Sequence, residues 1–117
     1  MTVSIQIRSV TTPVISGVPF EMAGSTQTDD TFPENALIVL QQSASAAGPW
    51  TAAGRFGTGS PLEHEPIPYV ANNSFIFHPV ANYACFTRAV VIVDEQVIDF
   101  PSTAVYLNVK QATPHED

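Results

Sequence analysis

The sequence predicts an all-β protein, an antiparallel β-sandwich of seven to eight strands with no substantial helix. Short apolar segments, some alternating with polar residues and some continuous, recur along the 117 residues. Ten prolines and six glycines separate these segments, and both residues are typical of turns between short strands. Nowhere do apolar residues recur with the 3.6-residue period of an amphipathic helix.

The N-terminal third predicts two strands and a loop. Residues 3–8 alternate apolar and polar side chains, as a half-buried strand does. Pro13 breaks this strand because proline cannot donate to a ladder, and residues 14–15 continue on another sheet edge. In residues 18–22, Val18, Phe20 and Met22 face one way and predict a second strand. Residues 24–35 are polar and predict a loop.

The middle of the chain predicts a hairpin and a long irregular stretch. Residues 36–42 begin with a continuous apolar run, which is typical of a central strand, and residues 50–56 form the second arm. Residues 57–73, rich in glycine and proline, predict a functional or mobile loop. Phe75 and Phe77 then alternate with polar residues in another strand.

The core strand is predicted at residues 83–93, the longest apolar run with β character. Its C-terminal half is β-branched and uncharged, which indicates burial on both faces. A turn at Asp94-Glu95 returns the chain along residues 96–100. The last strand alternates over residues 105–110.

The length is that of one domain. We expect a single sandwich over residues 1–110, with residues 2–14 as an N-terminal arm strand and residues 111–117 as a flexible tail. The N-terminus has neither the basic nor the apolar region of a secretory signal, so we expect synthesis in a cytoplasm. The single Cys85 excludes an internal disulfide and is compatible with a reducing compartment.

The charge balance excludes several partners. A formal net charge of −7 argues against nucleic acid and against an anionic membrane surface, both of which attract basic proteins. No apolar run is long enough to span a bilayer. Only 13% of the residues are charged, about half the usual share, which indicates that a partner covers part of the surface.

Three segments together resemble an immunoglobulin-like domain, especially the modules of phage virion proteins and bacterial surface proteins. Residues 37–43 followed by 48–51 resemble the third strand and its hairpin. Residues 87–91 resemble the sixth strand, and residues 104–109 the closing strand. The resemblance covers about residues 15–110.

The chain departs from that family at two points. The second-strand cysteine is absent, with Phe20 and Met22 in its neighbourhood, and Leu40 takes the place of the usual core tryptophan. The tyrosine corner has two possible registers, one beginning at Tyr83. Both registers put Cys85 on the same face, because side-chain direction has a period of two.

No catalytic constellation is visible, and we expect no enzyme, no metal and no cofactor. Glu63-His64-Glu65 offers metal-ligand types without a second histidine or cysteine at ligand spacing, so a solvated loop is the preferred interpretation. Asp29, Asp30 and Glu34 lack the glycine and alternation of a calcium loop, and again a solvated loop is preferred.

Cys85 paired with His78 is the remaining nucleophile candidate. No orienting acid or oxyanion hole is apparent, and Cys85 falls on an apolar strand, so a buried structural cysteine is preferred.

The core strand and the solvated loop predict opposite effects of substitution. We expect Val91→Asp to unfold the domain and Glu63→Ala to leave folding intact.

Trp50 and Arg88 have two interpretations each. Trp50 packs in the core under the hairpin, which is the preferred interpretation, or anchors a partner as an exposed aromatic. Arg88 lies at a sheet edge or pairs with an acid such as Asp99, or else contacts a partner. The partner-binding candidates are Trp50, Arg55, Glu63, His64, Glu65, Tyr69 and Arg88.

The resemblance implies a non-enzymatic virion protein, a capsid decoration or cement subunit that binds the outer capsid surface and bridges or stabilises capsid subunits. Its partners would be the major capsid protein or another virion protein and further copies of itself, with a trimer favoured, and its location the virion after synthesis in the host cytoplasm. The alternative is a carbohydrate- or cell-surface-binding module of a tail or surface protein, using Trp50, Tyr69 and Phe32.

Overall fold

A computed structural model of the chain describes residues 3–28, 35–98 and 101–111, and within them every regular element is a β-strand. The strands are β1 (Val3–Val10), β2 (Val14–Ile15), β3 (Met22–Thr28), β4 (Leu37–Ser43), β5 (Thr51–Ala52), β6 (Leu62–Glu63), β7 (Ile67–Pro68), β8 (Ser74–Phe77), β9 (Val80–Ala81), β10 (Cys85–Val93), β11 (Gln96–Ile98), β12 (Val105–Leu107) and β13 (Val109–Lys110). The all-β prediction is confirmed. The expected number of strands was too low because six of these strands are only two residues long.

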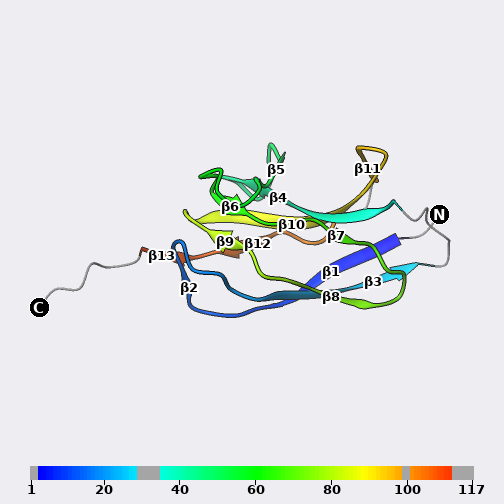
Figure 1. Cartoon of the computed structure of the whole chain (residues 1–117), viewed down its shortest axis with the longest axis horizontal. Coiled ribbons are helices and arrows are strands. Elements are labelled where there is room, and N and C mark those ends of the chain that lie inside the picture. The colour runs from blue at the N-terminus through cyan, green and yellow to red at the C-terminus, as the bar shows by residue number, and fades with distance from the viewer. Residues whose placement is uncertain (1–2, 29–34, 99–100, 112–117) are drawn as a thin grey trace, which may run out of the picture.

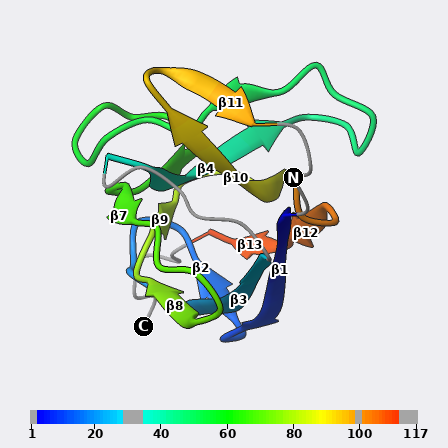
Figure 2. The same cartoon turned by 90° about the vertical axis from the view of Figure 1, so that its right-hand side faces the viewer.

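Two larger sheets lie face to face (Figures 1 and 2). One has the order β1-β3-β8, and the other the order β11-β10-β4-β5, with β12 also on β10 and β7 also on β4. Two small pairs, β2 with β13 and β6 with β9, lie beside them. The core between the sheets is built from buried residues of both, among them Ile5, Met22, Ile38, Leu40, Phe77, Ala89, Val91 and Leu107.

The order of the strands within each sheet follows a recognisable pattern. Strands β1, β3 and β8 pair in the order of the A, B and E strands of immunoglobulin-like sandwiches, and β10 lies between β4 and the closing strand, as F lies between C and G. The chain leaves the first sheet after β1, and β2 then runs parallel to β13, with Val14 opposite Val109. The expectation that residues 14–15 join another sheet edge is confirmed.

Strand β10 organises the larger sheet. It pairs antiparallel with β4, with β11 and with β12, so both of its edges carry neighbours along its length. Ala89, Val90 and Val91 are buried although they point alternately to opposite faces. Burial of the central strand on both faces is therefore confirmed. The hairpin of residues 36–42 and 50–56 is also confirmed, in the shorter form of β4 and β5.

The polar loop predicted at residues 24–35 begins too early. Strand β3 continues to Thr28, and its inward positions are Met22, Gly24 and Thr26. A β-carbon on Gly24 would collide with the backbone of Gln6 and the ring of Phe75, so only glycine lets these strands approach so closely. Small and polar inward residues hid this strand from a pattern search based on apolar alternation. Residues 29–34, with Asp29, Asp30 and Glu34, lie outside the described residues.

Two other expectations need correction. The stretch 57–73 holds strands β6 and β7, because its residues pair with β9 and with the start of β4. Val18 does not share the inward face of Phe20 and Met22, since strand β3 begins only at Met22 and Val18 is 48% exposed. Of the expected tail, residues 111–117, all but Gln111 lie outside the described residues.

Candidate protein-binding face

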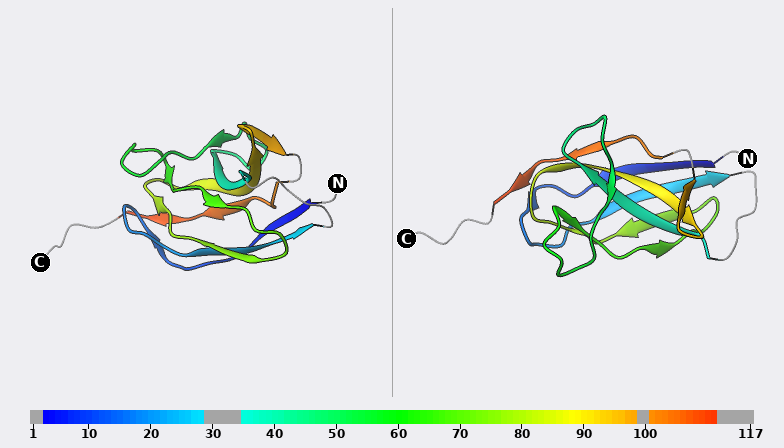
Figure 3. Two further views of the ribbon diagram at one scale, coloured as in Figure 1. Left: turned by 45° about the vertical axis from the view of Figure 1, so that its right-hand side comes forward. Right: turned by 90° about the horizontal axis from the view of Figure 1, so that it is seen from above.

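The larger sheet has one face toward the core and one face away from it, seen from above in Figure 3 (right). Because residues opposite each other in an antiparallel pair point the same way, the ladder between β10 and β4 defines the second face. Its facing pairs are Phe86 with Ser43, Arg88 with Gln41, Val90 with Val39 and Ile92 with Leu37. With Val97 on β11 and Tyr106 on β12, these residues form what is called below the outer face.

Arg88 is the charged residue of the outer face. It sits in the central strand rather than at a sheet edge, so that expectation was wrong, and Asp99 lies outside the described residues. Its Nε donates a hydrogen bond of 2.7 Å to Oε1 of Gln41. Its guanidinium carbon lies 4.4 Å from the centroid of the Trp50 ring. Partial burial of the guanidinium lowers the pKa of Arg88 from its ordinary value, although the group stays charged at neutral pH.

Trp50 belongs to this outer face and not to the core. It is half-buried and is absent from the set of residues that form or contact the core cluster. The preferred core interpretation was therefore wrong. The aromatic ring instead covers Arg88, and the stacking and the Gln41 bond together hold the guanidinium in one place.

The outer face is apolar on both sides of its centre. Toward one end Phe86 and Tyr106 are opposite each other, with ring centroids 5.0 Å apart, and Tyr106 is 53% exposed. Toward the other end Leu37, Ile92 and Val97 are opposite one another on three adjacent strands. Leu37 and Val97 are 38% and 45% exposed. Exposed apolar rows of this kind mark contact surfaces.

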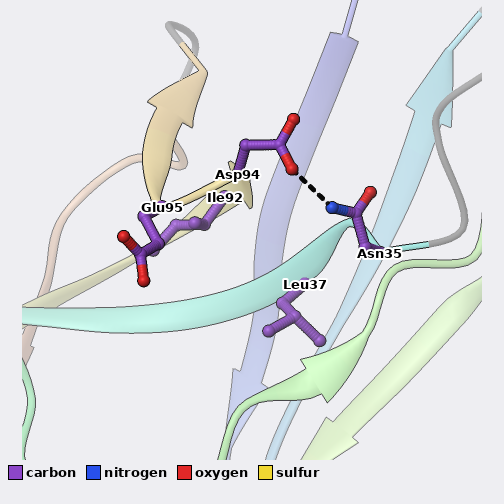
Figure 4. Close-up of a pocket in the computed structure, with 5 residues that line it drawn as sticks. All are labelled: Asn35, Leu37, Ile92, Asp94 and Glu95. Carbon is purple, nitrogen blue, oxygen red and sulfur yellow. Dashed lines mark hydrogen bonds between the residues drawn. The ribbon is translucent and has the colours of Figure 1, made fainter.

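A shallow pocket lies where the Leu37 end of the outer face meets the turn after β10 (Figure 4). Its lining residues are Asn35, Leu37, Ile92, Asp94 and Glu95. Nδ2 of Asn35 donates a hydrogen bond of 2.7 Å to Oδ1 of Asp94. Asp94 and Glu95 have φ angles of 51° and 65°, as the tight hairpin between β10 and β11 requires. The pocket therefore combines an apolar floor with two carboxylates.

Glu63 is a buried structural residue, so the solvated-loop interpretation was wrong. Its carboxylate oxygens accept hydrogen bonds from the backbone N–H of Gly57 at 3.1 Å and of Gly59 at 2.6 Å, and from Nδ2 of Asn82 at 3.1 Å. Both glycines have positive φ, which lets their N–H groups converge on the carboxylate. These hydrogen bonds, that of Gly57 first, hold the pKa of Glu63 below its usual value.

His64 is buried as well. Its Nε2 accepts a hydrogen bond of 3.0 Å from the backbone N–H of Leu40, so the neutral ring carries its proton on Nδ1. That Nδ1 has no hydrogen-bond partner among the described residues. Burial, with a further contribution from the charge of Arg55, lowers the pKa of His64. Glu63 and His64 thus tie the segment between β5 and β6 to the sandwich.

The other candidates do not converge on the outer face. Arg55 and Glu65 are exposed, and the backbone carbonyl of Arg55 accepts a hydrogen bond from the Thr58 hydroxyl. Tyr69 packs against the core cluster, and burial raises the pKa of its hydroxyl. Of the seven candidate residues, Trp50 and Arg88 are the two that make contact on the outer face.

Cys85 is a buried structural cysteine, as preferred from the sequence. It is 5% exposed, and burial raises the pKa of its thiol to about 11, so the thiol stays protonated at neutral pH. Within residues 3–28, 35–98 and 101–111, no three His, Cys, Asp or Glu side chains are grouped closely enough to hold a metal ion. No helix in the described part of the chain is long and apolar enough to cross a membrane.

Sequence reasoning missed the partners of Trp50 and Arg88 on this face. Phe86 is two residues before Arg88 in β10, and Ile92 is two residues after Val90. The period of two along a strand could therefore have predicted that these side chains share one face. Gln41 could not be found in this way, because it lies 47 residues before Arg88.

The comparisons with protein-family models, with curated proteins and with solved structures each found no match for this chain.

Proposed function

We propose that the chain is a non-enzymatic virion structural protein, an immunoglobulin-like capsid decoration or cement subunit that binds the outer capsid surface and bridges or stabilises capsid subunits. The observation that supports this proposal best is the outer face. Its two apolar rows combine exposed and half-buried side chains, and Arg88 is its one charged side chain among the described strands β4, β10, β11 and β12. A sheet face that remained in water would carry many more polar and charged residues.

The activity is adhesion. Each apolar side chain that moves from water into an interface contributes about 1.5 to 3 kcal/mol when fully buried, and the outer face offers several such side chains. Arg88 adds a directed contact, because Trp50 and Gln41 already hold its guanidinium in place and less side-chain entropy is lost on binding. The net charge of −7 favours encounter with a basic shell surface.

The carbohydrate-binding alternative has less support. Sugar rings stack on exposed aromatic side chains, yet Trp50 already stacks on Arg88. Tyr69 packs against the core cluster on the inner side of the sandwich, and Phe32 lies outside the described residues. Trp50 on the outer face and Tyr69 against the core therefore form no common platform.

The proposal is tested on purified virions of the phage whose genome encodes the chain. Quantitative mass spectrometry should find the chain at a copy number that is a simple multiple of the capsid symmetry. Particles made without it should lose their genome at a lower temperature, and added protein should restore that temperature. Particles that lack the chain, together with glycan binding by the free protein that is lost in Trp50→Ala, would establish the alternative instead.

A further inference from the structure

The outer face has a positive charge near its middle and two negative charges beyond one end. Arg88 lies in the central strand, held between Trp50 and Gln41. Asp94 and Glu95 lie in the turn beyond β10, six residues further along the chain, which at about 3.3 Å per residue is roughly 20 Å. Both carboxylates border the pocket whose floor is Leu37 and Ile92.

Each charged group has an apolar row beside it. The aromatic row, Phe86 and Tyr106, is two residues before Arg88 in the β10 register. The aliphatic row, Leu37, Ile92 and Val97, is two residues before Asp94. The two rows are separated by Val39 and Val90, which are already buried within the chain.

We propose that a second copy of this chain docks on the outer face through a two-fold axis that crosses β10 at the level of Val91. A two-fold contact is self-complementary, so residue i of one copy meets residue j of the other and the reverse. Arg88 of each copy then meets the Asp94-Glu95 turn of the other, and the Leu37, Ile92 and Val97 rows of the two copies pack on each other beside the axis. The contact therefore forms two equivalent ion pairs on either side of one apolar contact.

Charge favours a second copy at this face and disfavours one elsewhere. The chain carries 11 acidic and 4 basic residues, so most pairs of surfaces on two copies repel each other. At the outer face a fixed guanidinium meets a carboxylate, and Arg–carboxylate pairs are among the stronger charge-assisted contacts. Of the two carboxylates, Asp94 already accepts from Asn35, so Glu95 is the expected partner of Arg88.

This pairing deepens the proposed function, because a two-fold pair presents two identical docking surfaces and can bridge two capsid subunits. The pairing itself does not depend on the proposed function; only the role given to the pair rests on it. Pairing is measured on the free protein in solution, whereas the proposed function is measured on particles. A paired protein that is absent from virions would overturn the function and leave the pairing in place.

The experiment is a charge exchange followed by sedimentation velocity and equilibrium. The wild-type protein should form dimers as its concentration rises, and added salt should weaken them. Arg88→Glu alone and Glu95→Arg alone should each raise the dimer dissociation constant by about tenfold or more, because each puts like charges together. An equimolar mixture of the two variants should recover a mixed dimer, in which one of the two ion pairs is restored with its polarity reversed.

Arg8→Glu is the matched control. Arg8 lies on β1 in the other sheet, where its Nε donates to Ser25, and the substitution changes the net charge by the same amount as Arg88→Glu. It should leave the dimer unchanged. If Arg88→Glu lowers the melting temperature through loss of the Trp50 contact, Glu95→Arg in the exposed turn still provides the test. A monomeric wild type, a trimer, a dimer insensitive to both substitutions, or a mixture without recovery would each overturn the proposal.

Discussion

At the scale of single residues, Glu63 and His64 show how two adjacent titratable side chains can both serve the fold. Adjacent residues of an extended chain point in opposite directions. Glu63 turns toward the N–H groups of Gly57 and Gly59, and His64 turns toward the backbone of β4. Both side chains are buried with defined hydrogen bonds, so each links the stability of the segment between β5 and β6 to pH.

His64 should make the fold sensitive to mild acid. Its folded-state pKa lies below the ordinary value of 6.5, so neutral His64 stabilises the fold above that value. The contribution is lost as the pH falls from the unfolded pKa toward the folded one. Urea unfolding midpoints should therefore fall between pH 7.5 and pH 5.5, and His64→Gln should flatten that dependence. A matching flattening in His78→Gln, which alters an exposed ring, would contradict the assignment.

Glu63 should affect the stability of the fold at a lower pH than His64 does, and replacing its side chain should cost more free energy of unfolding. Glu63→Gln replaces one acceptor by a donor facing the Gly57 and Gly59 N–H groups, which should lower the free energy of unfolding by about 1 to 3 kcal/mol at neutral pH. Because the folded-state pKa is lowered, this stabilisation is present above the unfolded value of 4.5 and is lost as the pH falls through the folded value. Glu65→Gln, at the exposed neighbour, should change stability by less than about 0.5 kcal/mol. Equal effects of the two variants in chemical denaturation would show that Glu63 is solvated, and Glu63→Ala would then be harmless as the sequence suggested.

At the scale of elements, β10 connects the core to the candidate binding face. Its odd-numbered residues, among them Ala89 and Val91, belong to the core cluster. Its even-numbered residues, among them Phe86, Arg88 and Ile92, lie on the outer face. A change in the register of β10 by one residue would exchange these two sets. The strand therefore fixes both the stability of the sandwich and the arrangement of its contact surface.

Val91→Asp should unfold the domain. Val91 is 2% exposed between β4 and β11, and an unpaired carboxylate there would lose its hydration without gaining a partner. Far-ultraviolet circular dichroism and a thermal melt should show no cooperative transition. Ile76→Asp is the matched control, an equally apolar residue on strand β8 that is 49% exposed, and it should melt close to the wild type. A Val91→Asp protein that melts like the wild type would show that β10 is not the core strand.

At the scale of the whole molecule, apolar patterning predicted the fold class and the central strand, and long-range pairing decided the rest. The run around Val91 was found because a strand buried on both faces is apolar at every position. Strand β3 was cut short because Gly24 and Thr26 face inward without being large and apolar. The place of His64 depends on Leu40, which is 24 residues away, and no local pattern encodes that contact.

The candidate face was half predictable for the same reason. The alternation of Phe86, Arg88 and Ile92 follows from the sequence once the strand is known. The stacking of Trp50 on Arg88 depends on how β5 returns beside β4, because Gln41 pairs with both Arg88 and Ala52. Asp94 and Glu95 form the turn that the sequence predicts. Their nearness to Leu37 follows only from the register between β4 and β10.

Oxidative footprinting measures most directly whether the outer face is covered in the assembled protein. Wild-type protein is labelled with hydroxyl radicals under associating conditions and compared with the Arg88→Glu variant. We expect severalfold less labelling of Leu37, Ile92 and Val97 in the wild type. Labelling of Phe56 and Tyr83, which are 50% and 59% exposed elsewhere on the molecule, should be equal in both proteins. Unchanged labelling of this aliphatic row, or protection of Phe56 and Tyr83 in its place, would show that the outer face is not the contact surface.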